Sequence, residues 1–196
     1  STALIYSAFG VKHLGLTVLF FSLGVLSVIA AIRYTVGSNA YGYRALGDVF
    51  VFVFFGLVSV IGCYVLYAKQ IDHVVVLPAI TIGLLSTAVL NLNNMRDIAS
   101  DTKSKKQTLA VKLGSRNAIK YHNFLVVMAI VLSGLFGLFY YTSPYNLIFV
   151  VAYIPLLIHL IKVNKIKMPK LLDSELKTLA LTTFILAILM GIGHLL

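Results

Sequence analysis

Long apolar runs separated by short polar segments constrain the fold of this chain more than any other feature. Each run is long enough to cross a bilayer as a helix, because about 20 apolar residues span the hydrocarbon core. Hydrophobic residues make up 60% of the 196 positions and charged residues only 11%. The sequence therefore predicts an all-α, multi-pass membrane protein and excludes a soluble domain. Six full spans are expected, over residues 14–32, 49–68, 74–92, 124–141, 145–161 and 178–196.

Residues 1–9 are apolar but have no basic region and no cleavage-site pattern. They indicate the end of a membrane helix, and so a seventh, partial span, instead of a signal peptide. We expect the chain to be part of a longer protein and residues 1–196 to form one transmembrane domain. The single cysteine, Cys63, rules out a disulfide framework, and its apolar neighbours predict a buried thiol.

The basic residues are concentrated in three polar segments, at about residues 33–48, 96–120 and 162–177, which hold all of them except Lys12 and Lys69. Cytoplasmic loops of membrane proteins carry an excess of Lys and Arg, so these three segments are expected on the cytoplasmic side. The net charge of +10 is then a consequence of topology. The expected partner is the lipid bilayer, and nucleic acid is not.

The segment from residue 91 to residue 109 gathers much of the polar chemistry of the chain at the end of an apolar run. On a continuous helix, four of its side chains fall within an arc of about 120°, so two amides and two carboxylates share one face. Arg96 is expected to point away from that face. Three lysines follow closely. The four residues on the shared face are Asn91, Asn94, Asp97 and Asp101, and the lysines are Lys103, Lys105 and Lys106.

Carboxylates beside lysines suit a ligand that needs both, such as a magnesium diphosphate. Mg²⁺ is usually held by one or two protein carboxylates together with phosphate oxygens and water. Asp97 and Asp101 lie one helical turn apart and are candidate metal ligands, while the lysines could neutralise phosphate charge. The alternative is a solvated loop in which aspartates and lysines simply pair with one another.

Residues 93–101 followed by residues 106–114 resemble the second aspartate-rich motif of the UbiA superfamily of membrane prenyltransferases. Residues 34–37, 41–48 and 120–122 look most like the branch of menaquinone synthesis that prenylates 1,4-dihydroxy-2-naphthoate. The resemblance covers essentially the whole chain in order, with three separated motifs at plausible spacing.

This resemblance implies a bundle of nine transmembrane helices in the bacterial cytoplasmic membrane, with a cavity that faces the cytoplasm and opens sideways to lipid. Two aspartate-rich motifs there hold Mg²⁺ against a polyprenyl diphosphate. The diphosphate leaves, the aromatic ring attacks the allylic cation, and in the naphthoate branch the ring carboxylate is lost as CO₂, which gives demethylmenaquinone.

The chain departs from the family pattern in one respect. The first motif, of the Asn-Asp-x-x-x-Asp kind, does not occur, since Asp97 and Asp101 alone among the carboxylates have the required spacing. We expect the first two helices of the family fold to be missing from this sequence, and the polypeptide alone to be inactive.

By resemblance and position, Asp97, Asp101 and Lys106 are the expected catalytic residues, with Lys106 on the diphosphate. Arg44 and Asp48 are candidates for binding diphosphate or the naphthoate carboxylate, and their alternative is a structural ion pair at a helix start. Tyr41 and Tyr43 are expected either to line the path of the allylic cation or to belong to the interfacial aromatic belt. The full set of expected substrate contacts is Asn91, Asn94, Tyr41, Tyr43, Arg44 and Asp48.

Three other functions compete with this interpretation. The first is prenyl transfer to another aromatic acceptor, such as 4-hydroxybenzoate. The second is a transporter or channel, which predicts ionisable residues at mid-membrane depth, whereas the apolar runs here are almost free of them. The third is a non-catalytic membrane fragment. His122 is expected to be a satisfied interfacial histidine, and His159 a packing residue.

Overall fold

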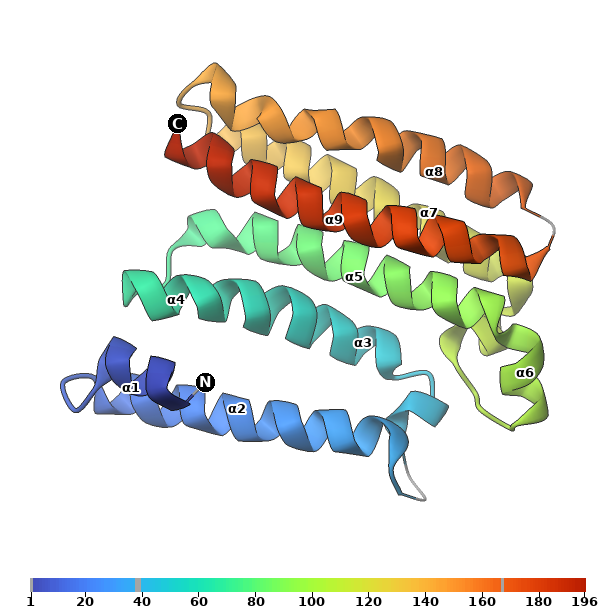
Figure 1. Cartoon of the computed structure of the whole chain (residues 1–196), viewed down its shortest axis with the longest axis horizontal. Helices are drawn as coiled ribbons and strands as arrows, with labels where there is room; N and C mark the ends of the chain where they lie inside the picture. Colours follow the sequence, from blue (N-terminus) through green and yellow to red (C-terminus); the bar gives the residue numbers. More distant parts are fainter. Residues whose placement is uncertain (1, 38–39, 167) are drawn as a thin grey trace.

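The computed structural model describes residues 2–37, 40–166 and 168–196, and within these ranges the chain forms helices and connecting turns but no strand. Six helical stretches are long and apolar enough to cross a membrane, as the sequence predicts. They run side by side along the longest axis of the molecule (Figure 1). The all-α membrane fold is confirmed. The spanning stretches are α2 (Leu14–Thr35), α3 (Gly47–Val51) continued by η2 (Phe52–Ile61) and α4 (Gly62–Ala68), α5 (Val76–Arg96), α7 (Leu109–Phe139), η4 (Pro144–Ala152) continued by α8 (Tyr153–Lys165), and α9 (Leu172–Leu195).

Short elements connect or precede these stretches. The chain starts with α1 (Thr2–Phe9), a helix of 8 residues, where the sequence predicts a partial span. The compact helix α6 (Ile98–Lys103) stands outside the row of spans at one end of the bundle (Figure 1). The remaining elements are single turns of 3₁₀ helix, namely η1 (Tyr41–Tyr43), η3 (His73–Val75) and η5 (Pro169–Leu171).

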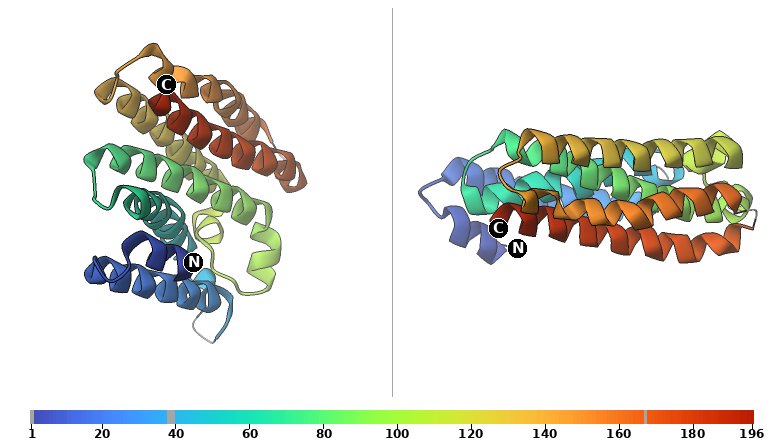
Figure 2. Two further views of the ribbon diagram at one scale, coloured as in Figure 1. Left: turned by 60° about the vertical axis from the view of Figure 1, so that its left-hand side comes forward. Right: turned by 90° about the horizontal axis from the view of Figure 1, so that it is seen from above.

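Helix α5 is central, with its buried side chains in one apolar core shared with α7, α8, α9 and η4. Leu85, Ala88 and Leu92 of α5 are fully buried there. The views in Figure 2 show α7, α8 and α9 on one side of α5, and α3–α4 on the other. A smaller apolar cluster, with Ile5 and Val65 among its members, joins α1 to α4. Helix α2 lies at the edge of the bundle and buries little of its surface.

The α3–α4 span crosses α5 at a point where both chains carry glycine. A Cβ on Gly56 would lie 2.5 Å from the Cα of Gly83, so neither position tolerates a larger residue without a shift. The middle of this span, η2, is π-helical over 10 residues. Small residues at such crossings let membrane helices approach closely and gain van der Waals contact.

The helices extend further into the polar segments than the sequence indicates, so the loops are shorter. Helix α7 starts at Leu109, because the Thr108 hydroxyl accepts a hydrogen bond from the Val111 amide and caps it. Gly114 then interrupts the helix, with φ of 71°. On the other side of the bundle, α8 extends to Lys165 and α9 starts at Leu172.

One local expectation was wrong, because Cys63 is exposed and not buried. Pro155 lies in the first turn of α8, just after the change from 3₁₀ to α-helix at Tyr153. A missing N–H costs least at that position.

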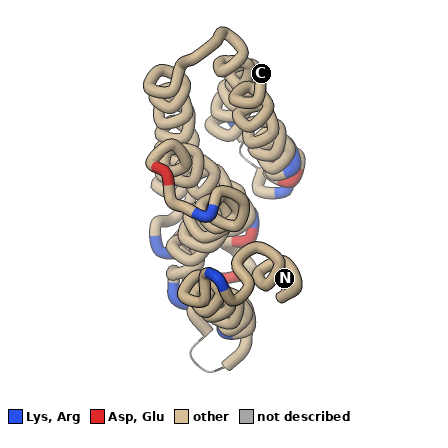
Figure 3. The backbone as a smooth tube through the Cα atoms, turned by 90° about the vertical axis from the view of Figure 1, so that its left-hand side faces the viewer, with Lys and Arg blue, Asp and Glu red and all other residues tan. Residues whose placement is uncertain are grey.

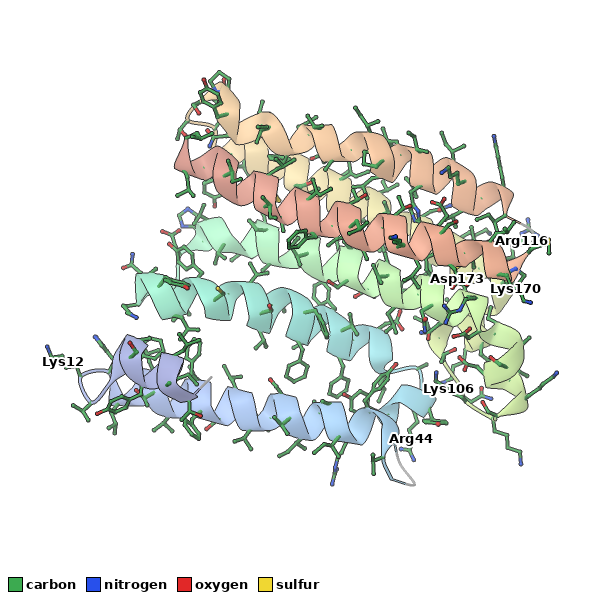
Figure 4. The ribbon with its side chains drawn as sticks, in the orientation of Figure 1. Lys12, Arg44, Lys106, Arg116, Lys170 and Asp173 are labelled. Carbon is green, nitrogen blue, oxygen red and sulfur yellow. The ribbon has the colours of Figure 1, made fainter. Side chains whose placement is uncertain are left out.

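Charge is distributed unequally between the two ends of the bundle. Few positions along the tube in Figure 3 carry a charge. The labelled residues Arg44, Lys106, Arg116 and Lys170 all lie at the end that carries α6, whereas Lys12 lies at the opposite end (Figure 4). The three basic segments therefore face the same side of the membrane, as the positive-inside pattern predicts. We call this end of the bundle the charged end.

Candidate active site

Two polar segments that are distant in sequence meet at the charged end. The backbone amide of Gln107, just after α6, donates a hydrogen bond to the carbonyl of Tyr43 in η1 at 3.1 Å. In Figure 4, Arg44 and Lys106 lie at the same corner of the bundle. The structure thus shows that the two segments lie at the same end of the bundle and contact each other.

The two candidate metal ligands remain one turn apart, although the helix breaks between them and α5. Asp97 has φ of −97° and ψ of 6°, so it ends α5 and precedes α6. The backbone amide of Asp101 donates to the carbonyl of Asp97 at 2.8 Å, which restores a helical turn. Because of the break, the four polar side chains are not on one continuous helix face.

Two buried oxygens near this break have no hydrogen-bond partner. Asn94 is 4% exposed and Asp101 is 7% exposed, and each has one side-chain oxygen, Oδ1 and Oδ2 respectively, without a donor. An unpaired buried acceptor is costly, and native proteins rarely keep one without a ligand or a functional reason. These oxygens are therefore available to a cation or to a ligand that donates hydrogen bonds.

Lys106 is placed next to Asp101 by the way α6 ends. Lys105 adopts a left-handed conformation, with φ of 57°, and the amide of Lys106 donates to the carbonyl of Asp101 at 2.8 Å. This pattern, together with the bond from Lys105 to the carbonyl of Thr102, is a Schellman motif. The Lys106 ammonium lies 3.4 Å from Asp101 Oδ1.

Arg96 does not point away from Asp97, and that expectation was wrong. Its Nε and Nη2 donate to both carboxylate oxygens of Asp97 at 2.8 Å, and its Nη1 donates to Asp173 of α9 at 2.6 Å. A fourth bond, at 2.8 Å, joins Nη2 to the side-chain oxygen of Asn93. The reason is the break at Asp97, which turns its carboxylate toward the preceding residue.

The Arg96 guanidinium holds the pKa of the Asp97 carboxyl below its usual range, chiefly through these hydrogen bonds. Partial burial opposes the effect, and the charges of Arg96 and Lys106 reinforce it. Asp97 is therefore ionised at neutral pH, but both of its oxygens are engaged by arginine.

Tyr41 and Tyr43 occupy different environments. The Tyr41 ring stacks on Phe50 with a centroid separation of 3.8 Å, and its hydroxyl donates to the carbonyl of Ala30 in α2. Burial is the main reason why the pKa of the Tyr41 hydroxyl is raised. Tyr41 lines an apolar cavity of about 650 Å³ between α2 and α3, whereas Tyr43 is exposed and outside this lining. The other aromatic residues of the cavity are Tyr34, Phe50, Phe54 and Phe55.

Asp48 and Asn91 lie deeper than the loop residues. Asp48 is buried, its carboxylate is within reach of the Tyr121 hydroxyl of α7, and its Oδ2 has no donor. The Asn91 amide donates to the carbonyl of Ala118 at 3.1 Å and so ties α5 to α7. A buried carboxylate repels anions, so Asp48 suits a hydrogen-bond donor better than a diphosphate. Arg44 lies just before α3 at the charged end (Figure 4).

The donor set suits a hard cation that shares its coordination with a phosphate ligand. Among the described residues no group of three or more His, Cys, Asp or Glu side chains could form an all-protein cage. Mg²⁺ rarely uses such a cage and takes oxygen ligands. The unpartnered oxygens of Asp101 and Asn94 fit this chemistry, and Asp97 fits it once Arg96 releases it.

A second buried polar group joins α7, α8 and α9 and was not predicted from the sequence. His122 Nε2 lies 2.9 Å from His159 Nε2, and His159 Nδ1 lies 2.8 Å from Glu175 Oε2. Lys162 is 3.4 Å from the other Glu175 oxygen. Glu175 therefore pairs with a histidine as well as a lysine, and His159 is more than a packing residue. The i, i+3 spacing of His159 and Lys162 was the one available signal.

These features define a multi-pass helical membrane protein with a cluster of charged and polar side chains at one end. The chain belongs to the UbiA prenyltransferase family, whose pattern matches residues 1–172.

Individual relatives support the same assignment. The chain is 43% identical over 179 residues to a 1,4-dihydroxy-2-naphthoate octaprenyltransferase of Escherichia coli (strain K12), covering 88% of this chain and 58% of that protein. A protein of the same name from Haemophilus influenzae is 43% identical over 176 residues, covering 90% and 57%. A UbiA prenyltransferase domain-containing protein 1 from Dictyostelium discoideum is 34% identical over 162 residues, covering 83% and 48%. The chain thus spans less than three fifths of the length of these relatives, and no solved structure matches it significantly.

Proposed function

We propose that this protein transfers a polyprenyl group from polyprenyl diphosphate to 1,4-dihydroxy-2-naphthoate, with loss of CO₂, to form demethylmenaquinone. The observation that carries the proposal is the meeting of the two polar segments at the charged end, joined from Gln107 to Tyr43, beside the unpartnered oxygens of Asn94 and Asp101. The names of the bacterial relatives supply the donor and the acceptor class.

In this proposal the basic residue at the charged end binds the diphosphate, and the acidic residues bind the cation. Lys106 binds a diphosphate oxygen and stabilises the negative charge that builds up as the carbon–oxygen bond breaks. Asp97 and Asp101 would hold Mg²⁺, and Asn94 would contribute an oxygen to the same region. The cation, when bound, offsets diphosphate charge and makes it a better leaving group.

The aromatic cavity next to this site suits the apolar part of the reaction. Tyr41, with Phe50 stacked on it, forms its wall near η1, and aromatic ring faces stabilise an adjacent positive charge. In this scheme the cavity receives the prenyl chain and keeps water away from the allylic cation. Tyr43 and Arg44 lie outside the cavity wall, at its entrance. There Arg44 attracts the naphthoate carboxylate. Asp48, with Tyr121 beside it, accepts a hydrogen bond from a ring hydroxyl.

The proposed location is the bacterial cytoplasmic membrane, with the charged end toward the cytoplasm. The excess of lysine and arginine at that end supports this orientation. The water-soluble naphthoate and the released diphosphate would then exchange with the cytoplasm.

The test is a prenyl-transfer assay on membranes that contain the full-length gene product, with 1,4-dihydroxy-2-naphthoate, a polyprenyl diphosphate and Mg²⁺. Asp101→Asn is expected to lower turnover on the order of a hundredfold, since it weakens the metal site. Asp72→Asn removes an equal charge at the opposite end, where Asp72 caps η3, and should retain most of the activity.

Equal activity of wild type and Asp101→Asn would contradict the proposal, as would turnover that persists after chelation of divalent cations. Turnover with 4-hydroxybenzoate in preference to the naphthoate would keep the reaction type and change the acceptor.

A further inference from the structure

Arg96 connects three polar side chains at the charged end. It donates four hydrogen bonds, two to Asp97, one to Asn93 and one to Asp173. These partners come from the end of α5, the α5–α6 break and the start of α9. A guanidinium that grips both oxygens of one carboxylate and also contacts a second carboxylate holds α9 against the break.

The same contact obstructs the proposed metal site. Each Asp97 oxygen accepts one hydrogen bond from Arg96 and keeps one lone pair, so a cation that binds there must sit beside the guanidinium. An arginine in that position would also lie next to the metal, and two like charges at such short range repel. A metal on Asp97 is therefore disfavoured while Arg96 keeps both of its hydrogen bonds to that carboxylate.

Arg96 can leave Asp97 without losing every partner. Its Nη1 is already on Asp173, the carboxylate of which is 61% exposed and free to rotate. The side chains of Arg96 and Asp97 are 30% and 33% exposed, so water reaches their contact and makes it easier to break than a buried pair. A rotation of the Arg96 side chain would let its guanidinium donate two hydrogen bonds to the Asp173 carboxylate.

We propose that Arg96 competes with the metal for Asp97, and that Asp173 receives the Arg96 guanidinium when the metal binds. The inference rests on the proposed metal role of Asp97. It makes Arg96 a positioning residue, which keeps the carboxylate ionised and paired until the metal arrives. Metal loading is thereby coupled to the contact between the α5–α6 break and α9.

The test measures Mn²⁺ binding to the purified protein by electron paramagnetic resonance, with Mn²⁺ as the probe for a hard divalent cation. Arg96→Gln should bind Mn²⁺ roughly three- to tenfold more tightly than wild type, because Asp97 becomes free. Arg96→Lys keeps the charge but cannot grip both oxygens, so it should also tighten binding, by a smaller factor. An effect of net charge alone would leave Arg96→Lys equal to wild type.

Asp173→Asn should have the opposite effect and weaken Mn²⁺ binding severalfold, since Arg96 loses its alternative partner. In the Arg96→Gln background the same substitution should change nothing, because Asp173 acts through Arg96. This double-mutant cycle separates a specific exchange of partners from a general change in the electrostatic field. Lys12→Gln, at the opposite end of the bundle, is the charge control for Arg96→Gln and should leave Mn²⁺ affinity unchanged.

The outcomes distinguish this inference from the proposed function. If Asp97→Asn weakens Mn²⁺ binding but neither Arg96 variant tightens it, the competition is refuted and the metal site stands. If Asp173→Asn weakens binding equally in both backgrounds, the exchange of partners is refuted. If wild type binds no Mn²⁺, or Asp97→Asn binds it as wild type does, both the inference and the metal role of Asp97 are wrong.

Discussion

The backbone amide of Gln107 donates a hydrogen bond to the carbonyl of Tyr43, and this contact closes the charged end of the bundle. It joins the segment after α6 to the 3₁₀ turn before α3. The bond uses main-chain atoms only, so the substitution of either side chain leaves it possible. The bond depends on the conformations of η1 and of the turn that ends α6. The first two predictions concern residues in these turns.

The first prediction concerns Tyr41, whose ring and hydroxyl hold η1 against α2. Tyr41→Phe keeps the stacking on Phe50 but removes the hydrogen bond to the carbonyl of Ala30. The free energy of unfolding should fall by about 1 kcal/mol. Denaturation of the protein in mixed micelles, monitored by circular dichroism, measures the change, and an unaltered midpoint would contradict it.

The raised pKa of Tyr41 predicts how this contact responds to alkali. Burial disfavours the tyrosinate, so the folded protein keeps the Tyr41 proton to a higher pH than the unfolded chain does. The contribution to stability is complete below the usual tyrosine pKa of about 10 and is lost as the pH rises through the higher folded value. Tyr41→Phe should flatten this alkaline decline in stability, and an equal decline in both proteins would refute the assignment.

The second prediction concerns the left-handed residue that ends α6. Lys105 has φ of 57°, a conformation that glycine adopts without penalty. Lys105→Gly should stabilise the protein by up to about 1 kcal/mol, because the relief of strain exceeds the entropy that glycine adds to the unfolded chain. Gly114 gives the opposite case.

Gly114 has φ of 71°, and a Cβ there would meet no other atom within 4 Å. Gly114→Ala should nevertheless destabilise the protein by about 1–3 kcal/mol, through backbone strain alone. Thermal unfolding midpoints of the two variants should move in opposite directions, and movement in the same direction would show that strain does not govern these positions.

The third prediction compares two glycines of the α3–α4 span. A Cβ on Gly56 would collide with Gly83 and with the carbonyl of Ala79, whereas one on Gly62 meets its nearest neighbour, Phe20, at 3.6 Å. Gly56→Ala should cost about 1–3 kcal/mol, because the helices must separate. Gly62→Ala makes ordinary contact and should cost less than about 0.5 kcal/mol. Equal losses of thermal stability would contradict the close crossing.

The fourth prediction concerns the second buried polar group, in which His122, His159 and Glu175 join α7, α8 and α9. Glu175→Ala removes the partner of His159 Nδ1 and of Lys162, and leaves a buried polar group unpaired. The cost should be about 3–5 kcal/mol. Asp173→Ala, two residues earlier and largely exposed, should cost less than about 1 kcal/mol. Denaturant titrations measure the free energy of unfolding of the two variants. Similar losses would refute a structural role for the buried polar group.

Helix number, the sidedness of the basic segments and the placement of two distant loops on one side all follow from the sequence. Apolar runs of about 20 residues have one stable solution in a bilayer, since every backbone polar group must be satisfied within the segment. The parity of the spans then places residues 41–48 and 97–107 on one side.

Side-chain direction at the charged end depended on tertiary structure. A helix wheel assumes a continuous helix through Asp97, and the break there turned the carboxylate onto Arg96. The contact from Arg96 to Asp173 and the chain from His122 to Glu175 join residues that lie 77 and 53 positions apart. Hydropathy fixes which segments cross the membrane, because it sums over many residues. Ion pairs across helices depend on rotations of a few degrees at single residues, and only the packed bundle determines those.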